Sequence, residues 1–167
     1  MKIPRIVVAS LMALGLSVAS SVAFASASQA EDSNVSIIRV YHAAVAPTSI
    51  TGSGIGTVRT FFIPIAVDGV AADGQYLVGT LTTLAEGVSD GQELRGSNLT
   101  FVVGDEANQL VVGGISLYPP AGATLAPGQR TIRPILGGSG TYDGARGQII
   151  STNLGSNGWT HVLRIRL

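Results

Sequence analysis

Hydrophobic residues along the chain gather in short runs rich in β-branched and aromatic side chains, and glycine, proline, Asp-Gly and Asn-Gly separate the runs. No stretch after residue 30 has apolar residues at the three- and four-residue spacing of an amphipathic helix. The turn signals between the runs are residues that accept positive φ at low cost, namely Asp68-Gly69, Asp73-Gly74, Asp90-Gly91 and Asn157-Gly158. The pattern predicts an all-β chain with eight strands: Val35–Ala43, Thr57–Val67, Gln75–Leu84, Glu93–Val103, Gln109–Tyr118, Thr131–Leu136, Ala145–Thr152 and Trp159–Leu167.

Eight strands favour a closed antiparallel β-barrel, because at this number the interior just fills with side chains or holds one small ligand. A β-sandwich is the alternative. The last run alternates cleanly and places Trp159, His161 and Leu163 on one face. Two longer loops are predicted, Pro47–Gly56 and Pro119–Gly128.

The run Gln109–Tyr118 is apolar on both faces. Leu110 and Val112 lie on one face, and Val111, Ile115 and Leu117 on the other. A strand of this kind needs cover outside the barrel as well as inside, from a loop, a ligand or a second subunit. We favour a homo-oligomer.

The first thirty residues have the order of a secretory signal peptide: a basic start at Lys2 and Arg5, an apolar run over Ile6–Val18, and small residues after it. Cleavage is expected after Ala25, Ala27 or Ala30, and an uncleaved anchor helix is the alternative. No cysteine follows the apolar run, which excludes a lipoprotein anchor. We therefore predict a leader over residues 1–30 and one domain over residues 31–167. The protein would be secreted, periplasmic or extracellular, with no membrane attachment after cleavage.

Composition excludes several classes of protein. The chain has 167 residues and no cysteine, so disulfide scaffolds, thiolate metal sites and cysteine nucleophiles are excluded. Without the leader, eight arginines face ten acidic residues, a net charge of −2. This balance lacks the basic footprint of a nucleic-acid-binding protein.

One glycine-rich segment is more specific than the rest of the chain: Gly137-Gly138-Ser139-Gly140-Thr141-Tyr142-Asp143-Gly144-Ala145-Arg146-Gly147-Gln148-Ile149. It resembles the Gly-Gly-Ser/Thr-Gly-x-Phe/Tyr-x-x-Ala/Val-Arg-Gly signature of the allene oxide cyclase and dirigent barrel superfamily, here as a secreted, bacterial-type member. The resemblance implies an eight-stranded barrel with an apolar cavity, commonly trimeric. Proteins of this type act on small hydrophobic molecules and guide a reactive intermediate into one ring or one stereoisomer.

Elementary stereochemistry assigns this segment mainly a structural role. Gly137, Gly138 and Gly140 allow a tight, left-handed corner between two strands, and Gly147 closes the signature. Tyr142 is expected to fold over the corner and cap the core. Arg146 is expected to satisfy a carboxylate or buried carbonyl groups. The alternative, a phosphate cradle, lacks the strand-to-helix context that it needs.

The chain departs from these relatives at their catalytic carboxylates. Allene oxide cyclases carry a glutamate on the first strand, which holds a polarising water, and the matching position here is His42. Dirigent proteins carry one aspartate inside the glycine-rich signature, where this chain has Thr141, and another after the early aromatic strand, where it has Phe62-Ile63-Pro64-Ile65.

Three polar residues are candidates for catalysis. His42 and His161 could act as general acids or bases, and Tyr41 could supply a hydrogen bond. The alternative for each histidine is a hydrogen-bonded core position. Two histidines without a third ligand at motif spacing do not predict a metal site, and no cofactor is expected.

A second set of residues is a candidate for ligand binding. Arg39 and Arg59 interrupt apolar strands, so they would bind an anionic ligand group or pair with acids such as Glu93 or Asp105. The acidic pair Asp105-Glu106 follows a predicted turn and suits a solvated hairpin tip. The aromatic residues expected either to line a pocket or to fill the core include Phe61, Tyr118 and Trp159.

Two functions compete. The first is a barrel that binds a hydrophobic small molecule as a cofactor-independent cyclase or isomerase, and the second is a non-catalytic ligand-binding or structural barrel. An open cavity of a few hundred cubic ångströms with convergent polar groups favours ligand binding, whereas a filled interior favours a structural barrel.

Overall fold

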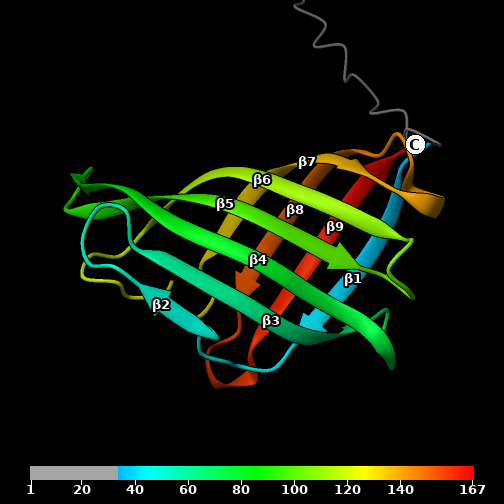
Figure 1. Cartoon of the computed structure of the whole chain (residues 1–167), viewed down its shortest axis with the longest axis horizontal. Helices are drawn as coiled ribbons and strands as arrows, with labels where there is room; N and C mark the ends of the chain where they lie inside the picture. The colour runs from blue at the N-terminus through cyan, green and yellow to red at the C-terminus, as the bar shows by residue number, and fades with distance from the viewer. Residues whose placement is uncertain (1–33) are drawn as a thin grey trace, which may run out of the picture. The chain divides into compact units, whose positions relative to one another are not determined.

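The computed structural model describes residues 34–167, so the expected leader lies outside the described residues. Within this range the chain is all-β apart from two short 3-10 turns (Figure 1). No helix in residues 34–167 is long and apolar enough to cross a membrane. The strands are β1 Ser36–His42, β2 Ser49–Thr51, β3 Val58–Val67, β4 Val70–Val88, β5 Gln92–Val102, β6 Gln109–Tyr118, β7 Arg130–Gly138, β8 Arg146–Asn153 and β9 Trp159–Arg166, with 3-10 turns η1 Gly140–Tyr142 and η2 Gly155–Asn157.

The strands form a closed antiparallel barrel. Their order is β1-β9-β8-β7-β6-β5-β4-β3-β2, and a further pairing of β1 with β3 closes the ring. The closure uses two residue pairs, Val40 with Val67 and Tyr41 with Ala66. Strand β2 pairs only with β3, so the barrel proper has eight strands. The predicted barrel is confirmed, and the sandwich alternative is wrong.

The eight predicted strands are all present, with two local differences. Strand β2 lies inside the segment Pro47–Gly56, which was expected to be a loop. Strand β4 runs through Asp73-Gly74, where a turn was predicted, because these residues lie in a bulge between the β3 pairings of Tyr76 and Ala71. Gly74 supplies the positive φ, +84°, that this irregularity needs.

Two of the predicted Asp-Gly turns do connect neighbouring strands. Asp68 and Gly69 have φ of +48° and +85°, and Asp90 and Gly91 have φ of +55° and +77°. Val67 pairs with Val70, so Asp68 and Gly69 form a two-residue hairpin loop, whose twist positive φ at both residues matches. Val88 pairs with Gln92, so the second loop has three residues, Ser89 to Gly91. Asp68 also accepts a hydrogen bond from the Arg39 amide at 2.9 Å, which ties this turn to β1.

Inward-facing residues change character along every strand of the barrel. They are apolar toward one end and polar toward the other; the polar residues come last on β1, β4, β6 and β8 and first on β3, β5, β7 and β9. Because neighbouring strands are antiparallel, all of the polar residues collect at one end. The apolar core at the opposite end comprises Ile38, Val40, Ile63, Ile65, Leu77, Leu99, Phe101, Leu110, Val112, Ile135, Ala145, Ile149, Leu163 and Ile165.

The glycine-rich segment forms the corner between β7 and β8. Gly140 has the expected positive φ, +61°, but Gly137 and Gly138 are not left-handed, so that part of the prediction is wrong. Gly138 is required by close approach instead, since a Cβ there would lie 2.6 Å from the Gln109 carbonyl oxygen. Tyr142 is half-buried and packs against the apolar core, as predicted.

The remaining residues of the signature complete this corner. Arg146 donates to the carbonyl oxygen of Ala145 at 2.7 Å. Gly147 has φ +145° and pairs with Ile165 of β9. The segment therefore builds the corner and closes the apolar end.

The outer face of β6 is apolar, as the sequence indicated. Ile115 is 59% exposed, and Leu117 is also exposed. Leu84 of β4 lies over the position of Gly96, which pairs with Ile115, and Leu136 of β7 lies over Gly113. We call Leu84, Ile115, Leu117 and Leu136 the outer apolar patch.

Candidate functional site

The polar end of the barrel contains an open cavity of about 530 Å³. Its walls come from the barrel strands, and its rim comes from the segment after β1 and the loop between β6 and β7. The lining combines polar and aromatic side chains with leucines, among them His42, Arg59, Phe61, Leu81, Arg95, Leu99, Tyr118, Arg133, Ser151, Trp159 and His161.

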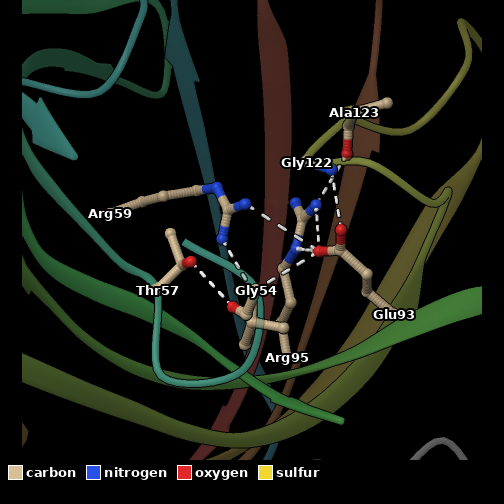
Figure 2. A network of polar contacts seen from close by, with 8 residues as sticks. Gly54, Thr57, Arg59, Glu93, Arg95, Gly122 and Ala123 are labelled. Carbon is tan, nitrogen blue, oxygen red and sulfur yellow. Dashed lines mark hydrogen bonds and ion pairs between the residues drawn. The ribbon is translucent and has the colours of Figure 1, made fainter. Parts of the chain in front are cut away.

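A buried ion cluster is built around Glu93, the first inward residue of β5 (Figure 2). Its Oε2 accepts hydrogen bonds from Arg95 Nε at 2.9 Å and Nη2 at 2.8 Å, and lies 3.8 Å from Arg59 Nη2. Its Oε1 accepts from the amide of Gly122 at 2.7 Å. The predicted pairing of Arg59 with Glu93 is confirmed, whereas Asp105 lies at an exposed hairpin tip, where its carboxylate accepts from the Ala107 amide.

The cluster sets the charge of its members. Burial alone would raise the pKa of Glu93, but the Gly122 amide and the guanidinium groups of Arg95 and Arg59 outweigh burial and hold that pKa below its usual value. Glu93 is therefore a carboxylate at neutral pH. Burial, followed by the neighbouring charge of Arg95, lowers the pKa of Arg59, and the charge of Glu93 opposes both effects.

Arg133 of β7 is the third buried arginine, and its surroundings differ. It is 3% exposed and donates to Thr131 Oγ1 at 2.6 Å and to the Tyr118 hydroxyl at 2.8 Å. Two guanidinium groups lie over the Tyr118 ring, with Arg95 Cζ 4.4 Å and Arg133 Cζ 6.0 Å from its centroid. Such contacts with the face of an aromatic ring stabilise a cation without neutralising it.

The two histidines stack on each other across β1 and β9. Their ring centroids are 5.2 Å apart, and the Trp159 ring stacks near His161 at 6.4 Å. His161 Nδ1 is hydrogen-bonded to Ser151 Oγ at 2.8 Å, and His42 Nδ1 to the Ala43 carbonyl oxygen at 2.7 Å. The other ring nitrogen of His161, Nε2, is buried and has no partner.

Both imidazoles are biased toward the neutral form. Burial, then the charges of His42 and Arg133, lower the pKa of His161 to about 3. Burial also lowers the pKa of His42, although the hydrogen bond to Ala43 opposes it. A neutral imidazole donates or accepts a hydrogen bond, but with this pKa His161 is a weak base and is not a proton donor at neutral pH.

The structure brings most of the predicted site residues together and separates two from them. His42, His161, Arg59, Phe61, Tyr118 and Trp159 all line the cavity. Tyr41 is 44% exposed on the outer face, where its hydroxyl donates to the Asn157 carbonyl oxygen at 2.8 Å. Arg39 is exposed as well, so the expectation that it needs a buried partner is wrong. Both residues occupy the outward positions of β1, between the inward Ile38, Val40 and His42.

Sequence inspection missed Arg95, Arg133 and Ser151. Each occupies an inward position of a predicted strand: Leu99 and Phe101 share the inward face of β5 with Arg95, and Ile149 shares that of β8 with Ser151. Extending the two-residue period along each predicted strand would have found all three.

Neither a known protein family nor a curated protein matches the sequence. Solved structures do match the fold. A structure named pyocyanin demethylase superimposes with a TM-score of 0.53 at 18% identity, over 78% of this chain and 98% of that one. A pterocarpan synthase dirigent protein superimposes with a TM-score of 0.50 at 14% identity, over 78% of this chain and 84% of that one. The chain therefore has the barrel fold of the dirigent proteins, as the glycine-rich signature indicated.

Proposed function

We propose that this barrel binds a hydrophobic small molecule in its cavity. The observation that carries the proposal is the open volume of about 530 Å³. An eight-stranded barrel has just enough side chains to fill its own interior, so unfilled space of this size is a departure from simple packing. It lies within the usual size range of ligand pockets.

The walls suit a molecule with an apolar body and a few polar atoms. Leu81, Leu99 and Phe61 offer apolar surface, and Trp159 offers a ring for stacking. The buried arginines, histidines and Tyr118 supply convergent hydrogen-bonding groups that would fix the orientation of a ligand. The names of the two structural neighbours refer to pyocyanin and to pterocarpan, and these names support a small-molecule ligand here as well.

The neutral dye N-phenyl-1-naphthylamine tests this function, because its emission rises on transfer to an apolar site. Leu81→Trp would place a larger side chain inside the cavity, and Val70→Trp would place the same side chain at an exposed position of the same strand, outside the outer apolar patch. We expect the wild type and Val70→Trp to bind the dye and Leu81→Trp to bind at least about tenfold more weakly, an effect of the size that overpacking produces. Equal binding by both variants, each shown to be folded by circular dichroism, would refute the cavity as the site.

A catalytic role is the second candidate, favoured by the neutral, stacked histidines in the cavity wall. Without a strong acid or base, the barrel would act as a cofactor-independent cyclase or isomerase that holds a flexible intermediate near its ring-closing geometry and excludes water. Incubation with unstable epoxide or quinone-methide intermediates tests this role through the chirality of the products. If the products are racemic although the protein still binds the dye, the catalytic role is refuted and the protein is a non-catalytic binding barrel.

We also propose that the protein is exported to the periplasm or the medium, with residues 1–30 removed. N-terminal sequencing of the secreted protein tests this proposal.

We further propose that a second copy covers the outer apolar patch in a homo-oligomer, a trimer as in the superfamily whose signature the glycine-rich segment resembles. Sedimentation tests this proposal: Ile115→Glu should convert the oligomer to a monomer, because it puts a charge into the covered surface. A wild type that sediments as a monomer would refute it.

A further inference from the structure

The interior of the barrel carries more positive than negative charge. Three arginines line the cavity, Arg59, Arg95 and Arg133, and each is at least nine-tenths buried. Within residues 34–167, Glu93 is the only acidic side chain that is buried. Since both histidines are biased toward the neutral form, they do not alter this balance. Buried charges without a counterion are costly, so the excess needs an explanation.

Glu93 cannot compensate all three arginines. Its two oxygens already accept from Nε and Nη2 of Arg95 and from the Gly122 amide (Figure 2). In addition, Thr83 Oγ1 lies 3.4 Å from Oε2. Arg59 shares the same oxygen at 3.8 Å and donates to Thr83 Oγ1 at 3.0 Å. The Glu93 carboxylate therefore interacts with Arg59 and Arg95 and does not neutralise Arg133.

Arg133 has only neutral partners in residues 34–167. Its Nη1 and Nη2 donate to hydroxyl oxygens, and its Nε is buried with no partner. The Tyr118 hydroxyl accepts from Arg133, so its own hydrogen remains free to donate. His161, in the same cavity wall, also has a buried ring nitrogen, Nε2, without a partner among residues 34–167.

We propose that the ligand of this cavity is an amphipathic acid, whose carboxylate or sulfonate group binds the Arg133 guanidinium beside the Tyr118 hydroxyl while its apolar body lies against Leu81, Leu99 and Phe61. An oxyanion in the cavity supplies the counterion that the Arg133 guanidinium lacks, because this residue lines the cavity and arginine binds such groups through charge-assisted hydrogen bonds. The inference rests on the proposed function and narrows the ligand to one chemical class.

Two dyes that differ only in the acidic group test it: 1-anilinonaphthalene-8-sulfonate and the neutral N-phenyl-1-naphthylamine. The wild type should bind the sulfonate about tenfold to a hundredfold more tightly than the neutral dye, as expected for charge-assisted hydrogen bonds. Arg133→Gln should abolish that preference by weakening binding of the sulfonate. Arg39→Gln removes the same charge from the exposed outer position of β1 and should keep the preference.

The outcomes separate the two proposals. If neither dye binds the wild type, the binding function itself fails. If both bind with equal affinity, or Arg133→Gln keeps the preference, binding stands and the acid subsite is refuted.

A second measurement needs no variant and guards against a misfolded Arg133→Gln. The wild type should be stabilised in thermal unfolding by dodecanoate and much less by 1-dodecanol at equal concentration, because at a given concentration the ligand with the higher affinity for the folded state stabilises it more. Equal shifts would refute the acid subsite.

Discussion

The two ends of the barrel interior are built on the same strands with opposite chemistry. Strand β5 carries Leu99 and Phe101 at the apolar end and Glu93 and Arg95 at the polar end, all facing inward. At the apolar end, side chains fill the space and stability comes from burial. At the polar end, space remains and stability depends on how well each buried charge is compensated. Strand alternation thus identifies the inward residues, and the change of chemistry along the strand locates the site.

The largest loss in the free energy of unfolding should come from truncation of Phe101, which is fully buried at the apolar end of the barrel. Phe101→Ala removes a ring and leaves a cavity, so we expect a loss of about 4 kcal/mol in the free energy of unfolding. Urea titration followed by circular dichroism measures it. Phe62→Ala, at an exposed outward position of β3, should cost far less. A loss below about 1 kcal/mol for Phe101→Ala would contradict a close-packed end.

At the polar end, neutralising Glu93 should cost somewhat less, about 3 kcal/mol, because it leaves Arg59 and Arg95 buried beside an uncharged amide. The same urea titration applies to Glu93→Gln. Glu106→Gln, at the exposed hairpin tip, is the matched control and should be nearly neutral. If adding Arg59→Gln to Glu93→Gln recovers none of the loss, charge compensation is not its cause.

The smallest effect concerns pH. His161 has a pKa of about 3 in the folded state and near 6.5 when unfolded, so between these values the unfolded state binds the extra proton. Stability should therefore rise with pH across this window and be lost as pH falls below about 6.5, by about 2 kcal/mol between pH 7.5 and pH 5. Thermal unfolding across this range measures the slope. His161→Asn should reduce the slope and leave the part that the lowered pKa of His42 contributes, and an unchanged slope in this variant would contradict a buried, neutral His161.

Sequence patterns were sufficient for the fold because short runs rich in β-branched and aromatic residues recur along the chain and turn-forming residues separate most of them. The exceptions have local causes: β4 bulges at Asp73-Gly74, and β2 is a three-residue strand in a polar loop. The glycine-rich corner was predicted from its residues, but the need for glycine at Gly138 depends on the close approach of the Gln109 carbonyl, which only the fold reveals.

The candidate site was harder to predict. His42, His161 and Arg59 stood out as polar residues in apolar runs, and the cavity collects all three. Arg39 gave the same signal but faces outward, because a one-residue step along β1 reverses the face. Glu93 neutralises the charge of Arg95, whereas no carboxylate neutralises the charge of Arg133 within the described residues. This difference depends on distances across strands and loops, which no local sequence pattern contains.

The closure of the ring has a consequence for how the chain folds. Strand β1 lies between β9, the last strand, and β3; it pairs Ser36 with Ile165 but meets β3 at only two positions. The hairpins from β3 to β6 join neighbours in sequence and can form early, whereas β1 has to wait for the final strand. Contacts so distant in sequence slow folding, so ring closure should be the late step, and amide hydrogen exchange should be fastest at the β1–β3 seam.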